Sequence, residues 1–237
     1  AVAAMGLASF VWIERRTEKP LVDVTIFRNR ALSAAMITVI LSHMLHNPIA
    51  LASPLYLQNV LDASAVGAGL LLAILPLSTA LASALSGRLA DRFDASAVAT
   101  VGIGLIVVGI AFYACLGVDS HFAMVGGVLV LLGAGIGFFT PANQKVAFAS
   151  VTKEDYGVLA AMLSSFGTAA GTIGTTIAVA LMENAGGGAL WTSKAVFAGA
   201  QQFAFACLVP LGLVAVVISM PAKGRGSATA RDGVSRS

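Results

Sequence analysis

The sequence predicts an all-α integral membrane protein, and three observations lead to that fold class. Hydrophobic residues make up 58% of the 237 residues and charged residues only 11%, whereas soluble domains carry about 25% charged residues. The mean hydropathy is +0.91, so most of the surface needs lipid as its solvent. Long apolar runs such as 102–116 show no alternation of apolar and polar residues, which argues against a membrane β-barrel.

Six stretches are long and apolar enough to cross a bilayer, which takes about 20 residues in a helix. We expect these spans at residues 31–57, 66–86, 95–117, 122–144, 157–182 and 196–220. Together they form one predicted six-span unit over residues 31–220.

The segments outside that unit have their own character. Residues 1–13 are apolar but too short to cross a bilayer alone, and no basic region precedes them as it would in a signal peptide. We therefore expect residues 1–13 to be the end of a preceding, truncated transmembrane helix. Residues 14–30 are predicted to be a cytoplasmic linker, and residues 221–237 a disordered cytoplasmic tail rich in Gly, Ser, Ala and Arg.

The basic residues predict the orientation of the spans. If residues 14–30 are cytoplasmic and each span reverses the side, every basic residue except Lys194 lies in a cytoplasmic segment. Such a bias in short loops orients helices during membrane insertion. Both ends of the six-span unit are therefore predicted to be cytoplasmic. The net charge of +3 has a topological origin on this interpretation and does not indicate nucleic-acid binding.

A polar cluster lies near the middle of the first span. His43, His46 and Asn47 are three and four residues apart, so they share one helix face, and Pro48 frees a backbone carbonyl nearby. The cluster could face a cavity, where it would bind substrate or sense protons. Alternatively, its side chains could form hydrogen bonds between packed helices.

Two further sets of residues are candidates. Asn143 and Gln144, at the cytoplasmic end of the fourth span, could line a gate or lie at the membrane interface. Small residues at four-residue spacing let helices approach closely. Gly133 and Gly137 of the fourth span and Gly167 and Gly171 of the fifth have this spacing; they could serve static packing or movement of one helix against another.

The sequence shows few features of a catalytic or ion-coupling site. Its carboxylates lie in loops or at span ends, not near the bilayer midplane where ion-coupling carboxylates are found. We see no nucleophile paired with a base, no phosphate-binding glycine loop and no metal-ligand cluster. We therefore expect no catalytic residue, no cofactor and no metal.

The loop after the second span carries a motif. Residues 87–93 read Gly-Arg-Leu-Ala-Asp-Arg-Phe. We expect Gly87 to end a helix and Asp91 to cap the next helix or pair with an arginine, while Arg88 and Arg92 hold the loop in the cytoplasm. This motif resembles the loop signature of the major facilitator superfamily, Gly-x-Leu-Ala-Asp-Arg.

Other stretches are similar to one branch of that superfamily, the fourteen-span drug:proton antiporters (DHA2, EmrB/QacA-like). They are Pro-Leu-Val-Asp at 20–23, Phe-Arg-Asn-Arg at 27–30 and Pro-Leu-Tyr-Leu-Gln-Asn-Val at 54–60. The resemblance implies the C-terminal six-helix bundle of the superfamily fold, a 3+3 inverted repeat. It also implies an inner- or plasma-membrane exporter of hydrophobic or cationic compounds in exchange for protons, with an N-terminal half as partner that holds the coupling carboxylate.

Two alternatives remain open from the sequence. The chain could belong to an uptake carrier for a small metabolite, or it could be a non-transporting fragment or assembly partner. Direct assays of substrate movement by a full-length protein would distinguish these functions.

Overall fold

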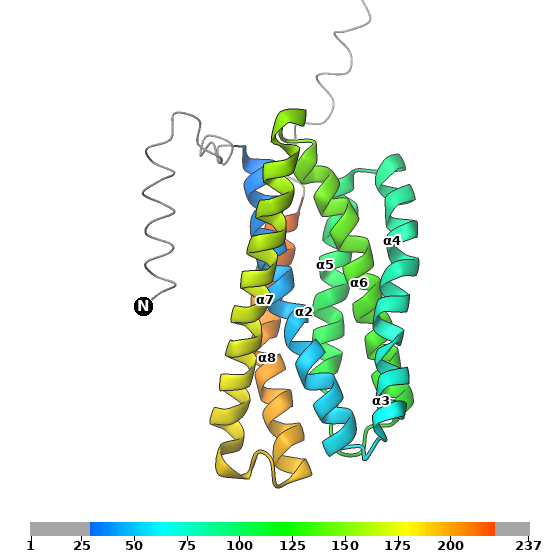
Figure 1. Ribbon diagram of the computed structural model, residues 1–237, viewed down its shortest axis with the longest axis vertical. Helices are drawn as coiled ribbons and strands as arrows, with labels where there is room; N and C mark the ends of the chain where they lie inside the picture. Colours follow the sequence, from blue (N-terminus) through cyan, green and yellow to red (C-terminus); the bar gives the residue numbers. More distant parts are fainter. Residues whose placement is uncertain (1–28, 221–237) are drawn as a thin grey trace, which may run out of the picture.

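The computed structural model describes residues 29–220, and every regular element in that range is helical (Figure 1). Six helical spans are long and apolar enough to cross a membrane. They are α2 (Arg30–Asn59), α3 (Ala65–Leu72) with α4 (Ile74–Arg92), α5 (Ala95–Tyr113), α6 (Phe122–Phe148), α7 (Tyr156–Gly186) and α8 (Lys194–Ser219). The predicted all-α membrane fold is confirmed. The predictions for residues 1–13, for most of 14–30 and for 221–237 lie outside the described residues.

Polar side chains fix where three of these helices begin. Asn29 Oδ1 accepts a hydrogen bond from Ala31 N (3.0 Å), Ser64 Oγ from Gly67 N (3.1 Å) and Asp94 Oδ1 from Ser96 N (3.1 Å). Each bond satisfies a backbone N–H that has no partner within the first helical turn. At the other end of α7, Gly187 adopts a φ of 53°, a backbone conformation that favours glycine.

The helices pack as two related halves. α2 contacts α7 and α8, and α6 contacts α4 and α5, while α5 touches α8 and α2 touches α6. Exchanging the first span with the fourth, the second with the fifth and the third with the sixth reproduces this set of neighbours. Exchanged spans run in opposite directions because three crossings separate them, as in an inverted repeat. Figure 1 shows the two groups, α2, α7 and α8 beside α4, α5 and α6.

Charge is unequally divided between the two ends of the bundle. The basic residues near the start of α2, the α4–α5 turn and the α6–α7 connection gather at one end, and within residues 29–220 only Lys194 lies at the other. Lys194 Nζ forms a salt bridge with Asp62 in the α2–α3 connection. The single exception to the charge bias is therefore paired with a carboxylate at its own end.

The sides of the bundle expose apolar residues. On α3 and α4 the side chains of Leu70, Leu77 and Leu81 are 71%, 62% and 68% exposed. A stripe of exposed leucines along a helix of this length is a surface that only lipid or another apolar surface can cover. The chain is a multi-pass membrane protein.

Candidate functional site

The predicted polar cluster lies on α2 with its side chains half-buried. His43 and His46 have ring centroids 5.0 Å apart, so they share a face as their spacing predicts. His43 Nδ1–H donates to Val39 O (2.9 Å) and His46 Nδ1–H donates to Ser42 O (2.6 Å), because a carbonyl oxygen can only accept. Each neutral ring therefore keeps Nε2 as a free acceptor.

His43 and Asn47 face the glycines of α7. A Cβ added to Gly167 would lie 2.9 Å from His43 Nε2, and one added to Gly171 would lie 2.7 Å from Asn47 Cγ. The two sets of residues singled out in the sequence, the polar cluster and the glycines of the fifth span, thus form one seam between α2 and α7. The structure describes this seam closed. A cavity-facing role for His43, His46 and Asn47 stays a prediction.

On the seam, the two helix backbones meet next to a carbonyl that has lost its helical partner. Pro48 has no N–H to offer the carbonyl of Met44 four residues earlier. Gly174 of α7 packs on this point, and a Cβ added there would lie 2.8 Å from the carbonyl carbon of Met44. The close approach of the Gly174 backbone suits a Cα–H···O contact to the free oxygen. Proline and glycine together let two backbones meet here.

Beside the glycines, a neighbouring face of α7 carries a line of hydroxyls that we call the hydroxyl ridge: Ser164, Thr168, Thr172 and Thr176. All four are exposed. Thr168, Thr172 and Thr176 each donate to the carbonyl four residues earlier, at 2.9, 3.1 and 2.9 Å. Their protons are therefore in use, and the hydroxyl oxygens present acceptor lone pairs outward. The four-residue spacing of these hydroxyls is visible in the sequence, but only the structure shows that all four are exposed.

The glycines of α6 pack on α4. Cβ atoms added to Gly133 and Gly137 would lie 2.8 Å from Ser78 Cβ and 2.7 Å from Ala82 Cβ. Because the added atoms would overlap α4, the two helices depend on these glycines for their separation.

Asn143 and Gln144 have different surroundings. Asn143 is buried, donates through Nδ2 to Ala35 O (3.1 Å) and lies 3.1 Å from the Thr38 hydroxyl through Oδ1. It therefore ties α6 to α2. Gln144 is exposed. A gating role for the two residues stays a prediction.

The loop motif at residues 87–93 differs from its predicted local structure in two ways. Gly87 does not end a helix, because α4 continues to Arg92 and ends at Phe93. Asp91 neither caps the next helix nor pairs with an arginine: Asp94 caps α5, and Asp91 Oδ1 forms a salt bridge with Lys145 Nζ of α6 (2.7 Å). Gly87 is half-buried and its φ is not positive, so the helix passes through it without a turn.

Lys145 binds α4 at two points. Its Nζ donates to Ala90 O (2.6 Å) as well as to Asp91. Two bonds from one ammonium group hold the last turn of α4 against α6. Arg92 is exposed, as is Arg88, and both lie at the end of the bundle where the basic residues gather. A functional role for Gly87, Asp91 and Arg92 stays a prediction.

Sequence reasoning gave no role to Gln201 of α8, although its side chain is fully buried. Neither Gln201 Nε2 nor Oε1 has a hydrogen-bond partner among the described residues. Its neighbour Gln202 donates to Leu116 O (3.1 Å). A buried amide without partners costs about 1–3 kcal/mol for each unsatisfied group.

Replacing Gln201 by leucine is therefore expected to stabilise the protein, raising the thermal midpoint in detergent by several degrees. Leucine has nearly the volume of glutamine and leaves no polar atom to desolvate. Gln202→Leu provides the control and should lower the midpoint, because it orphans the Leu116 carbonyl. A lower midpoint for Gln201→Leu would contradict this account of the buried amide.

Among residues 29–220 no three His, Cys, Asp or Glu side chains come close enough to hold a metal ion. His43 and His46 are neighbours, but no third side chain of these types joins them in the described part of the chain.

Comparisons with known proteins agree with a transporter architecture. The Major Facilitator Superfamily profile matches residues 33–235. The chain is 28% identical over 182 residues to the lincomycin resistance protein LmrB of Listeria monocytogenes, covering 77% of this chain and 39% of that protein.

Two further relatives match over similar lengths. The multidrug resistance protein Stp of Mycobacterium tuberculosis is 30% identical over 177 residues, covering 74% of this chain and 32% of that protein. The riboflavin transporter RibZ of Clostridioides difficile is 24% identical over 162 residues, covering 68% and 36%. The chain thus spans between 32% and 39% of the length of these relatives. By the extent of the profile match, the chain belongs to the major facilitator superfamily, a family of membrane transporters and not of enzymes.

Proposed function

We propose that this chain forms the C-terminal six-helix bundle of a secondary active exporter of hydrophobic or cationic compounds. Two relatives are named for resistance to lincomycin or to several drugs, and each is more than twice as long as the matching region. The remainder of such a protein would supply an N-terminal bundle. Substrate would then cross the membrane by rocking of the two bundles around a site at the bilayer midplane.

The hydroxyl ridge on α7 is the observation that carries this proposal. Polar side chains within a membrane span usually face protein or water and not lipid. Thr168, Thr172 and Thr176 donate inward along their own helix and offer acceptors outward. Acceptors without competing donors favour ligands that bring ammonium or N–H groups. A cationic substrate has the complementary chemistry.

We infer that the carboxylate that couples transport to protons lies outside the described residues. The carboxylates within residues 29–220 lie at helix ends or in connections, away from the midplane where a coupling carboxylate is expected. In this proposal the N-terminal half carries that group. The fourteen-span drug:proton antiporter branch would combine the two halves in one chain.

The orientation in the membrane is also part of the proposal. The bundle would lie in the inner or plasma membrane of a cell. Its basic end would face the cytoplasm, and this end carries Arg30, Arg88, Arg92, Lys145 and Lys153. The Asp91–Lys145 salt bridge would then lie on the cytoplasmic side, where it joins α4 to α6. A latch at this position would control how far these two helices separate during the transport cycle.

The function is tested with the full-length protein in proteoliposomes. Replacing both His43 and His46 by alanine is expected to reduce substrate export several-fold or shift its pH profile, while insertion stays intact. His43 Nε2 lies against Gly167 on the α2–α7 seam, and the His46 ring lies beside that of His43, with centroids 5.0 Å apart, so opening the seam would expose the pair to substrate or protons. Unchanged export and an unchanged pH profile would mean that His43 and His46 serve only helix packing. Export that persists without a pH gradient would refute proton coupling.

A metabolite carrier is the second candidate, and the similarity to a riboflavin transporter favours it. The same proteoliposomes distinguish the two functions. Competition by riboflavin but not by hydrophobic cations would support the metabolite carrier.

A further inference from the structure

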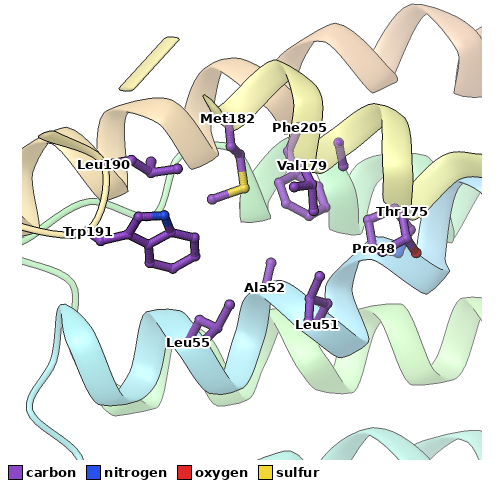
Figure 2. A pocket seen from close by; sticks show the side chains of 11 residues that line it. Pro48, Leu51, Ala52, Leu55, Thr175, Val179, Met182, Leu190, Trp191 and Phe205 are labelled. Atoms are coloured by element: carbon purple, nitrogen blue, oxygen red, sulfur yellow. The ribbon is translucent and has the colours of Figure 1, made fainter. Parts of the chain in front are cut away.

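A small apolar pocket lies on the α2–α7 seam beyond Pro48, toward the end of the bundle that carries Lys194. It has a volume of about 180 Å³ and is closed on its third side by Phe205 of α8. Figure 2 shows Leu51, Ala52 and Leu55 of α2 opposite Val179 and Met182 of α7, with Trp191 at one end and Pro48 and Thr175 at the other.

The pocket exists because the seam changes character at Pro48. On one side of it, Gly174 holds α7 against the backbone of Met44. On the other side, α7 carries Ala178, Val179 and Met182, which line the pocket. Ala52 and Ala178 are buried and too small to fill the space between them. A tight glycine contact followed by small side chains thus leaves a hollow.

No polar group faces this hollow. The single hydroxyl in the wall belongs to Thr175, and it donates to Gly171 O (2.9 Å) within α7. A cavity lined by apolar side chains stays dry, and one of about 150 Å³ accommodates a molecule of benzene size. The walls therefore select an uncharged aromatic ring and reject water and charged groups.

The mouth of the pocket is accessible. Leu51 and Trp191 are 44% and 62% exposed, so the pocket opens between them. Along α7, Thr172 lies three residues before Thr175, and Thr176 three residues before Val179. Residues at that spacing are neighbours on a helix surface, so the hydroxyl ridge and the pocket wall form adjacent strips.

We propose that this pocket binds one aromatic ring of a substrate whose cationic group lies on the hydroxyl ridge. This inference rests on the proposed function, because it assigns a subsite to the same exporter. The ring would enter past Trp191 and rest against Phe205, which closes the pocket from α8. Because the pocket and the hydroxyl ridge lie side by side, they would favour molecules whose positive charge lies close to an aromatic ring.

Binding of para-bromobenzylammonium, whose ammonium group carries N–H donors, to the purified full-length protein tests the inference. Bromine quenches a nearby indole, so the part of the quenching that Trp191→Phe removes reports occupancy of this pocket. Ala52→Leu fills the pocket, and Ala178→Leu fills it from the opposite wall. Both are expected to weaken binding at least tenfold. Ala50→Leu adds the same side chain at an exposed position of the same helix and should leave binding unchanged.

Several outcomes would overturn the inference. Equal affinity in the filled and control variants would place the ring elsewhere. Quenching of Trp191 by brominated lipid that the cation cannot displace would make the occupant an acyl chain. Transport with no pocket-dependent binding would refute the subsite alone. Pocket-dependent binding without any transport would refute the exporter function and leave the pocket in place.

Discussion

Replacing Gly174 by alanine is expected to lower the thermal midpoint of the protein by about 10 °C. The added Cβ would lie 2.8 Å from the carbonyl carbon of Met44 and would also meet its oxygen and Cα. Backbone atoms cannot turn aside as a flexible side chain can. The destabilisation should therefore reach the upper end of the range for overpacking, about 3 kcal/mol. At about 2–4 °C per kcal/mol for a protein of this size, that loss gives the expected shift.

Gly127→Ala provides the matched control for this prediction. Gly127 is an exposed glycine inside α6, and nothing lies within 4 Å of an added Cβ. Alanine there should leave the protein as stable or more stable by up to about 1 kcal/mol, because of its better helix propensity. The midpoints are measured in detergent, together with the fraction that elutes as a single species. If the two variants have the same thermal midpoint, α2 and α7 do not pack backbone to backbone at Gly174.

Much of the fold follows from local sequence properties. Each span is an apolar run of about 20 residues or more. Residue type narrows the choice of caps without fixing it, because the motif predicts Asp91 as the cap of α5 and Asp94, three residues later, takes that place. Gly87 shows the limit of this approach. A glycine often marks a helix end, yet α4 passes through Gly87 and ends only at Arg92, because five further residues continue the helix without strain.

The candidate site could be predicted only in part, since its pairings join distant segments. The sequence indicated both His43 and Gly167, but their contact depends on α2 packing beside α7. Asp91 likewise has its partner Lys145 54 positions along the chain. Gln201 and Gln202 are the same residue type side by side, and only the packing of α8 decides which one is buried. Helix neighbours are a tertiary property that periodicity alone does not encode.

Replacing Thr168, Thr172 and Thr176 together by valine is expected to slow export of hydrophobic cations by about tenfold to a hundredfold. Valine keeps the branched shape of threonine but removes the oxygen acceptors of the hydroxyl ridge. A hydrogen bond to a charged group contributes about 1.5–3 kcal/mol, and each 1.4 kcal/mol corresponds to about tenfold in binding. Losing even one or two such contacts gives the expected range. Initial export rates of the full-length protein in proteoliposomes measure it, normalised to the amount inserted.

Two control variants separate ligand binding from packing. The triple Thr→Ser variant keeps all three oxygens and loses only methyl groups, so it should retain most of the export. Thr79→Val removes a hydroxyl with the same bond to the carbonyl four residues earlier, here Leu75 O at 2.9 Å, but on α4 instead of the ridge. It should have little effect. If the serine variant fails as badly as the valine variant, the methyl groups pack against a partner helix and the ridge does not bind substrate. If the valine variant exports normally, the exposed face of α7 lies against lipid, and the cation-binding role of the ridge is wrong.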